Sequence, residues 1–246
     1  NDKLHLSLSA FGKDFLVDAG RYAYTGEIAK KFRPYALSSK GHNLVLIDGK
    51  VQEDGPRLAD KPVDSKRVKL TEDFDFASSS FDDFIDLEGK ASHNRSLFYV
   101  RGAFWVVVDR IQTDHWHPDA EVQQNGNNTV GSYSEGSLEV VPVGDVSFDI
   151  QMIKGQEQPE IQGWYSPEYN IYEPNVASIY NNDIKGDATL VWLLIPTPGN
   201  AKKLVSRAKI IGENQNAIQL EVSYNGQIYE LFIPFEDNKY AKLSKR

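Results

Sequence analysis

Apolar and polar residues alternate with period two along most of the chain. Near the start, Leu4, Leu6 and Leu8 alternate with His5 and Ser7, which is typical of a strand with one buried face. Similar patterns or short apolar runs predict further strands at Phe15–Asp18, Leu44–Asp48, Arg67–Leu70, Phe84–Leu87, Leu97–Val100, Phe104–Ile111, Glu121–Gln123, Leu138–Val141, Val146–Ile153, Ala188–Leu194, Ala208–Ile211, Ile218–Tyr224 and Gln227–Phe232.

Turn residues separate these segments, and helical patterns are scarce. Asn225-Gly226 lies between two alternating runs and predicts a tight hairpin, because both residues tolerate a positive φ. Only Gly26–Phe32 favours a turn or two of helix. Many strands without intervening helices predict one all-β domain over residues 1–246, a large antiparallel β-sandwich of stacked sheets with very little helix.

Composition narrows the function classes. No apolar run approaches the roughly 18 residues that span a bilayer, so no membrane span is expected. The chain has no cysteine, which excludes disulfides and thiolate metal sites. A net charge of −8 argues against a nucleic-acid partner.

The charges are unevenly distributed. Between residues 21 and 50 there are six cations against two anions. The cations are Arg21, Lys30, Lys31, Arg33, Lys40 and Lys50. Such a basic segment in an acidic protein indicates either local attraction of an anion or an ordinary solvated loop.

The same segment contains a candidate metal pair. Asp18 ends one predicted strand and His42 precedes the next. Carboxylate and imidazole are both ligands that zinc accepts. A lone histidine in a loop equally fits a hydrogen bond to the backbone.

Two stretches resemble a known family. The match covers Asp2–Gln52, with the motifs Val17-Asp18-Ala19-Gly20 and Gly41-His42-Asn43, and more loosely Ser92–Tyr99 and Phe104–Asp109. These motifs resemble the heparinase II/III-like domain of polysaccharide lyases, which include heparin/heparan sulfate lyases and related alginate lyases.

The resemblance implies a role for named residues. Asp18 and His42 match the family's ligands of a divalent metal, zinc, whose third protein ligand, a histidine, would lie just before Asn1 and outside this chain. Tyr35 matches an active-site tyrosine and is the expected catalytic residue. The expected substrate-binding residues are Arg21, Lys30, Lys31, Arg33 and Asn43.

The resemblance also implies partners and a location. The substrate would be an acidic, uronate-containing polysaccharide such as heparan sulfate. An N-terminal α/α-toroid domain of the same parent protein, absent from this chain, would carry the main acid/base tyrosine, so the fragment alone is expected to be inactive. A periplasmic or secreted location follows from the same resemblance.

The expected reaction is β-elimination, which removes the C5 proton of a uronate and expels the glycosidic oxygen at C4. Removing this proton builds negative charge on the carboxylate side, so amide, imidazole or guanidinium groups must neutralise it. A tyrosine or histidine then serves as base and a tyrosine as acid.

Other interpretations remain open from sequence alone. The chain could be a non-catalytic carbohydrate-binding or structural sandwich, or a cupin-like metal enzyme using His115 and His117. His93 with Arg95 indicates inter-strand hydrogen bonding, and His5 fits a supporting or solvent-exposed position. The cluster of Trp164, Tyr165, Tyr169 and Tyr172 could stack on sugar rings or pack over the end of the sandwich.

Overall fold

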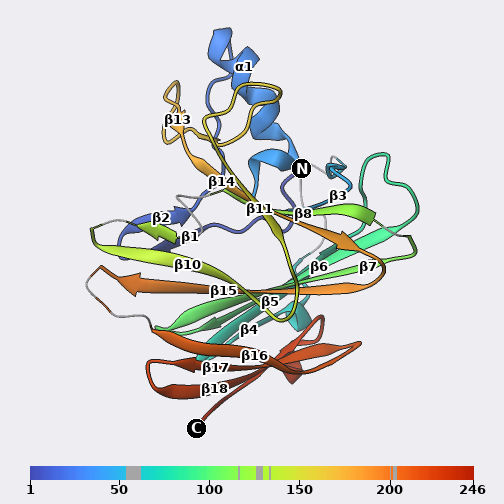
Figure 1. Ribbon diagram of the computed structural model, residues 1–246, viewed down its shortest axis with the longest axis vertical. Helices are drawn as coiled ribbons and strands as arrows, with labels where there is room; N and C mark the ends of the chain where they lie inside the picture. The colour runs from blue at the N-terminus through green and yellow to red at the C-terminus, as the bar shows by residue number, and fades with distance from the viewer. Residues whose placement is uncertain (54–61, 116, 126–129, 133, 200, 202–203) are drawn as a thin grey trace.

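A computed structural model describes residues 1–53, 62–115, 117–125, 130–132, 134–199, 201 and 204–246, with the side chains of 117–125, 130–132 and 206 left out. Three β-sheets are stacked on one another, and one helix projects from one end (Figure 1). This confirms the predicted all-β sandwich with little helix.

The middle layer is a seven-stranded antiparallel sheet. Its strands, in spatial order, are β4 (Val68–Leu70), β5 (Phe74–Phe81), β6 (Ala91–Val100), β7 (Phe104–Thr113), β15 (Ala188–Pro198), β10 (Gly136–Val143) and β9 (Val130–Ser132).

Each face of this sheet is covered by a four-stranded sheet. One consists of β11 (Asp149–Lys154), β14 (Val176–Ile184), β8 (His117–Asn125) and β3 (Val45–Ile47). The other is the C-terminal sheet of β16 (Val205–Asn214), β17 (Ala217–Tyr224), β18 (Gln227–Pro234) and β19 (Lys242–Lys245).

Burial on both faces explains the continuous apolar runs of the central strands. In β15, Val191 and Leu193 pack toward the C-terminal sheet, whereas Trp192 and Leu194 pack toward the sheet that contains β3 and β14. A strand buried on both faces has no polar side to alternate with.

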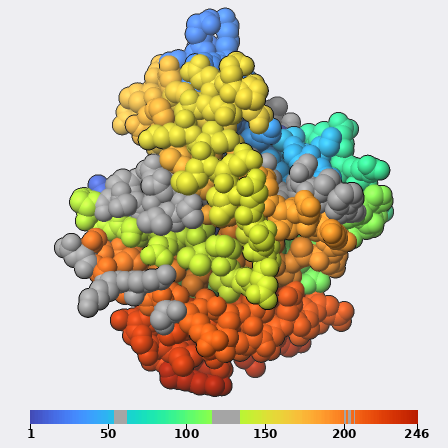
Figure 2. All heavy atoms as spheres, in the orientation of Figure 1, coloured from blue at the N-terminus to red at the C-terminus, as the bar shows by residue number. Residues whose placement is uncertain are grey.

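The remaining elements are short. They are β1 (Leu8–Ala10) with β2 (Lys13–Leu16), β12 (Trp164–Tyr165) with β13 (Glu173–Pro174), helix α1 (Gly26–Leu37), and the 3-10 turns η1 (Ser39–Gly41), η2 (Ser65–Arg67) and η3 (Asn238–Tyr240). The blue atoms of α1 and the yellow atoms of the segment after β11 form one end of the molecule (Figure 2).

Several predicted elements differ in extent. Strand β1 begins only at Leu8, and Leu4, the first residue of the predicted alternation, has a φ of 69°, which is outside the extended region. At Phe84–Leu87 the structure has only a single bridge from Phe84 to Gln52. The patterns gave no indication of β5 or β14, whose buried faces include serines and a tyrosine.

Helix α1 is longer than predicted and continues through Pro34 to Leu37. Beyond the predicted end, Tyr35 and Ala36 are buried against the loop that contains Ile161 and Trp164. Tertiary packing therefore offsets the hydrogen bond that a proline removes from a helix. The Asn225-Gly226 hairpin is confirmed, with φ values of 48° and 78°.

Candidate functional site

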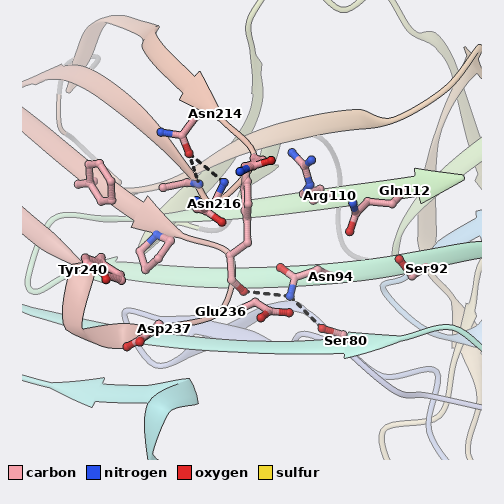
Figure 3. A pocket seen from close by; sticks show the side chains of 15 residues that line it. Ser80, Ser92, Asn94, Arg110, Gln112, Asn214, Asn216, Glu236, Asp237 and Tyr240 are labelled. Carbon is pink, nitrogen blue, oxygen red and sulfur yellow. Dashed lines mark hydrogen bonds between the residues drawn. The ribbon is translucent and has the colours of Figure 1, made fainter.

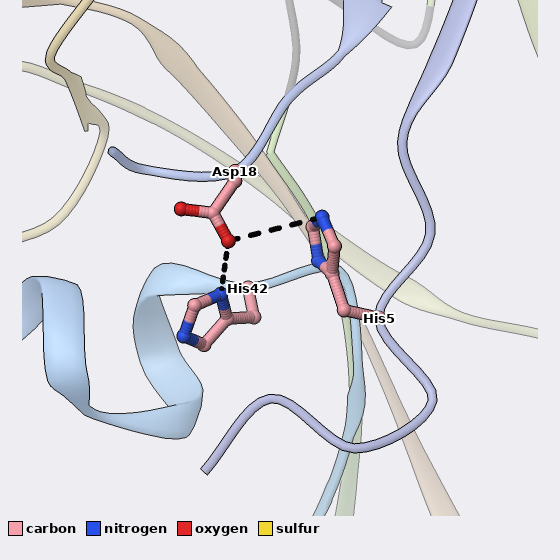
Figure 4. Close-up of side chains that lie close together, drawn as sticks. All are labelled: His5, Asp18 and His42. Carbon is pink, nitrogen blue, oxygen red and sulfur yellow. Dashed lines mark hydrogen bonds and ion pairs between the residues drawn. The ribbon is translucent and has the colours of Figure 1, made fainter. Parts of the chain in front are cut away.

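Asp18 and His42 lie side by side at the base of α1. Asp18 follows β2 and His42 follows η1, and the His42 Nδ1 lies 2.8 Å from the Asp18 Oδ2 (Figure 4). Because an ionised carboxylate can only accept, the His42 Nδ1–H donates this bond. The two segments are also joined by the Ala19 N–H, which donates to the Gly41 carbonyl at 3.1 Å.

The Asp18 carboxylate is kept ionised by its neighbours. Its second oxygen accepts the Gly20 N–H at 2.8 Å. Burial alone would raise the pKa of Asp18, but the hydrogen bonds from His42 and Gly20 outweigh it and lower the pKa below its usual value. Asp18 therefore presents a negative charge at the surface of this cluster.

His5 completes a group of three potential ligands. Its Nε2 lies 3.9 Å from the Asp18 Oδ2, and the ligand atoms of His5, Asp18 and His42 all lie within 4.8 Å of one another (Figure 4). Among the described residues this is the only such cluster of three. The sequence indicated only a supporting or solvent-exposed position for His5. The irregular backbone before β1 brings His5 to the site, and the alternating pattern did not reveal this path.

His5 is a neutral ring in this arrangement. Its Nδ1 accepts the Asn43 N–H at 3.1 Å, so the proton of the neutral imidazole is on Nε2. Burial lowers the pKa of His5 to about 4, although the nearby Asp18 partly opposes this.

Asn43 acts as a clamp beneath the cluster. Its side-chain N–H₂ donates to the carbonyls of Leu6 at 2.7 Å and Val17 at 3.1 Å, and the residue is only 1% exposed. It therefore binds the three segments that carry His5, Asp18 and His42 together. The substrate contact expected of Asn43 stays a prediction.

A buried ionic network supports the same segments from the central sheet. Arg95 donates from one nitrogen to the carbonyls of Leu4 and Asn43, each at 2.7 Å. Its other nitrogens donate to both oxygens of Asp109, at 2.7 and 3.1 Å. Arg95 thus connects the residues next to His5 and His42 to the core.

Asp109 is the centre of this network. It is fully buried and also accepts bonds from His93 Nε2 at 2.7 Å and Trp192 Nε1 at 3.1 Å. Burial alone would raise the pKa of Asp109, but the Arg95 guanidinium and His93 hold it well below its usual range. The predicted inter-strand bonding of His93 and Arg95 is confirmed, with Asp109 as the shared acceptor.

Tyr35 lies inside α1's interface rather than on an open surface. It is 5% exposed, and its hydroxyl donates to the Gln162 Oε1 at 2.8 Å. Burial raises the pKa of this phenol, which disfavours the phenolate. Tyr35 holds α1 to the loop before β12, and its catalytic role stays a prediction.

The predicted substrate-binding cations divide into two groups. Lys31 pairs with Glu157 at 2.6 Å, Lys30 pairs with Glu27 at 2.7 Å, and the acids neutralise both lysines. Arg21 and Arg33 form no ion pair with any described residue. Arg21 instead donates to the Tyr24 hydroxyl at 3.2 Å, and the Arg33 guanidinium lies 5.0 Å from the centre of the Tyr24 ring.

The predicted aromatic cluster is also divided. Trp164, which is half-buried, and Tyr172, which is 39% exposed, both pack against Phe32 of α1. Tyr169, which is 55% exposed, lies 5.7 Å from the ring of Tyr24, which is 54% exposed. Two exposed rings beside two unpaired guanidinium groups form a surface that we call the Tyr24–Tyr169 surface, defined by Arg21, Tyr24, Arg33 and Tyr169.

Gly20 sets the distance between the cluster and the loop after β12. Its φ is +91°, and a Cβ there would lie 2.4 Å from the Ser166 carbonyl oxygen. We expect Gly20→Ala to lower the unfolding free energy by more than the ~1–2 kcal/mol cost of a left-handed alanine. Gly26→Ala is the control, because its φ is +83° with no atom within 4 Å of the added Cβ. Equal urea midpoints for the two variants would show that the contact with Ser166 is not constraining.

The cupin-like alternative gains no support from the described residues. His115 lies after β7, and its Nδ1 bonds the adjacent Asp114 at 2.9 Å. The side chain of His117 lies outside the described residues.

No helix in the described part of the chain is long and apolar enough to cross a bilayer.

Comparisons with known proteins agree on one family. Residues 1–207 match the family described as Heparinase II/III-like, C-terminal. A curated relative, heparin-sulfate lyase of Bacteroides stercoris, is 22% identical over 233 residues, covering 88% of this chain and 32% of the relative.

Solved structures share the fold at low identity. The heparan sulfate lyase of Pedobacter heparinus superposes with a TM-score of 0.72 at 16% identity, over 96% of this chain and 37% of that one. Heparinase III superposes with a TM-score of 0.69 at 17% identity, over 95% and 36%. This chain spans about a third of the length of these proteins, and it belongs to the heparinase II/III-like C-terminal domain family.

Proposed function

We propose that this chain is the β-sandwich part of a lyase that cleaves uronic-acid-containing polysaccharides of the heparan sulfate type by β-elimination. The observation that carries the proposal is the cluster of His5, Asp18 and His42 on a fold of this family. Arg21, Tyr24 and Arg33 of the Tyr24–Tyr169 surface follow Asp18 closely in the chain, and the surface supplies groups suited to an anionic sugar.

The Tyr24–Tyr169 surface fits the chemistry of an acidic polysaccharide. Guanidinium groups donate paired hydrogen bonds to carboxylate and sulfate oxygens. Arg21 and Arg33 retain this capacity because no described acid pairs with them, unlike Lys30 and Lys31. The half-exposed rings of Tyr24 and Tyr169 offer apolar faces for the C–H side of a sugar.

The residues of the cluster fit a divalent metal of the zinc type. Two imidazoles and one carboxylate are an ordinary zinc donor set, and the His42 Nδ1 and Asp18 Oδ2 lie 2.8 Å apart, which supports ligation of one ion by both groups. Ligation through the His42 Nδ1 would require the imidazole proton to be on Nε2 instead, so that Nδ1 offers its lone pair to the ion. The bound ion would supply a fixed positive charge that orients the Asp18 turn and the His42 loop.

His5 is the in-chain candidate for the third ligand. Ligation through the His5 Nε2 would require the imidazole proton to move to Nδ1. Nδ1 would then no longer accept the Asn43 N–H. The sequence resemblance placed this ligand before Asn1, so metal binding by this chain alone distinguishes the two sources.

The remaining catalytic groups are proposed to come from elsewhere. The relatives are about three times as long as this chain, which leaves room for the helical domain implied by the resemblance. That domain would contribute the acid/base tyrosine and the groups that neutralise the uronate. We propose a periplasmic or secreted location on the same family grounds.

The experiment that tests this function uses the full-length protein that contains the chain. It is incubated with heparan sulfate, alginate and a neutral glucan, and the ultraviolet absorbance of unsaturated uronides is followed. We expect the absorbance to rise with heparan sulfate and to stay flat with the neutral glucan, which has no acidic C5 proton. Binding of heparan sulfate without any rise would instead indicate the non-catalytic carbohydrate-binding alternative.

A further inference from the structure

An open cavity of about 670 Å³ lies between the central sheet and the C-terminal sheet, away from the metal cluster (Figure 3). One wall is formed by β6 and β7 and the other by the β16–β17 turn together with the segment after β18. The second wall lies beyond residue 207, where the family match ends.

Amide side chains dominate the walls. Asn94, Gln112, Asn214, Gln215 and Asn216 all line the cavity. Asn94 and Asn214 are engaged: Asn94 donates to Ser80 and to a carbonyl, and Asn214 accepts two N–H groups of its turn.

The other three amides are available to a ligand. The side chains of Gln112, Gln215 and Asn216 are exposed, and none bonds a described residue. Each offers one acceptor and two donors at the cavity. Sugar hydroxyls require this mixture, because every hydroxyl both donates and accepts.

Arg110 supplies a largely buried donor group. Its side chain is 12% exposed and its guanidinium lies 4.7 Å from the centre of the Phe235 ring. The nearest carboxylate oxygens, from Asp187 and Glu213, are each 3.7 Å away, beyond hydrogen-bond distance. No hydrogen bond links the guanidinium to a described residue, although burial of such donors is costly unless oxygens accept from them.

The charge around the cavity selects against anions. Arg110 is flanked by Asp187 and Glu213, and Glu236 and Asp237 line the opposite wall. Glu236 and Asp237 pair with Arg67 and Lys239, and Asp187 and Glu213 face Arg110, so these charges leave no free cation among the described lining residues to attract a sulfated chain. In this the cavity differs from the Tyr24–Tyr169 surface, whose guanidinium groups form no ion pair with a described residue.

Aromatic surface completes the site. The rings of Phe232 and Tyr240 line the cavity and are accessible, and Tyr240 is 49% exposed, whereas Phe235 is 3% exposed and contacts the Arg110 guanidinium. Such rings pack against the apolar face of a pyranose while amides bond its hydroxyls.

We propose that this cavity binds an uncharged pyranose unit, separately from the site that handles the acidic polymer. Binding here does not depend on β-elimination, so it can hold whether or not the proposed lyase function does. A neutral sugar site would retain the protein on uncharged stretches of a polysaccharide or on accompanying glycans.

The test is a calorimetric titration of this chain with three probes: cellotetraose, chitotetraose and a fully sulfated heparin tetrasaccharide. We expect at least one neutral probe to bind with a Kd of about 1 mM or tighter. Gln112→Ala removes one neutral hydrogen-bonding group and should weaken binding of that probe about 3- to 10-fold. Arg110→Gln should weaken it about 10-fold or more, because bonds from a charged donor are stronger.

Gln151→Ala is the matched control, since Gln151 is an exposed glutamine of β11 that does not line the cavity. Thermal unfolding checks that each variant is folded. The proposal is overturned if no neutral probe binds at millimolar concentration, if Gln112→Ala binds like Gln151→Ala, or if Gln112→Ala weakens only the sulfated probe.

Discussion

Replacing Asp109 with asparagine is expected to lower the free energy of unfolding by about 3–5 kcal/mol, the cost of leaving a buried charge without its partner. Asp109 is fully buried and accepts bonds from Arg95, His93 and Trp192. Asparagine keeps the size of the side chain but removes its charge, so the Arg95 guanidinium becomes an uncompensated cation in the core.

Asp75→Asn is the control for this prediction. Asp75 also accepts a 2.7 Å bond from an arginine, Arg101, but this pair is on the surface, with the arginine side chain 46% exposed. We expect a loss below about 1 kcal/mol for it, as for other exposed pairs. Similar urea-unfolding losses for the two variants would contradict the role of Asp109.

The contribution of Asp109 should also depend on pH with a definite sign. Its pKa is depressed in the folded state, so its stabilising effect is complete above the unfolded carboxyl pKa of about 4. The effect is lost as the pH falls below that value toward the folded pKa. The stability gap between the parent protein and Asp109→Asn should therefore narrow in acid.

The second large effect is expected at the candidate metal cluster of His5, Asp18 and His42. Asp18→Asn and His42→Ala should each reduce zinc affinity by more than the roughly 10- to 100-fold that follows loss of an outer-shell partner. Each change removes one of two donors that already lie 2.8 Å apart. Competition with a chromophoric chelator, using this chain and zinc alone, measures the affinity.

The same titration identifies the role of His5. A His5→Gln loss as large as that of His42→Ala would make His5 the third ligand. A loss within the 10- to 100-fold range would make it a supporting residue of Asp18. His115→Ala is the control, because His115 is an exposed histidine outside the cluster whose side chain bonds Asp114. Unchanged affinity in both Asp18→Asn and His42→Ala would rule out the cluster as a metal site.

Much of the fold could be predicted from local patterns. The continuous apolar runs at Phe104–Ile111 and Ala188–Leu194 predicted buried strands. These runs arise because the central sheet is covered on both faces. The Asn225-Gly226 turn was specified by two residues. Strand β5 was less visible, because its Ser78, Ser79 and Ser80 interrupt the apolar pattern and Ser78 bonds a distant carbonyl.

The site was only partly predictable, since its contacts join residues far apart in sequence. The motifs around Asp18 and His42 located the pair, but His5 reaches them through an irregular segment held by Arg95. The pairing of Lys31 with Glu157 depends on a loop more than a hundred residues away. Local sequence therefore indicated which residues are charged but not which charges are neutralised.

We propose that the cluster of His5, Asp18 and His42 is the functional site of a polysaccharide lyase. The most direct measurement is unsaturated-uronide absorbance from heparan sulfate, comparing the full-length protein with its His42→Ala and His115→Ala variants, each confirmed as folded. We expect a rise for the parent and for His115→Ala and almost none for His42→Ala. Full activity in His42→Ala would contradict this role of the cluster.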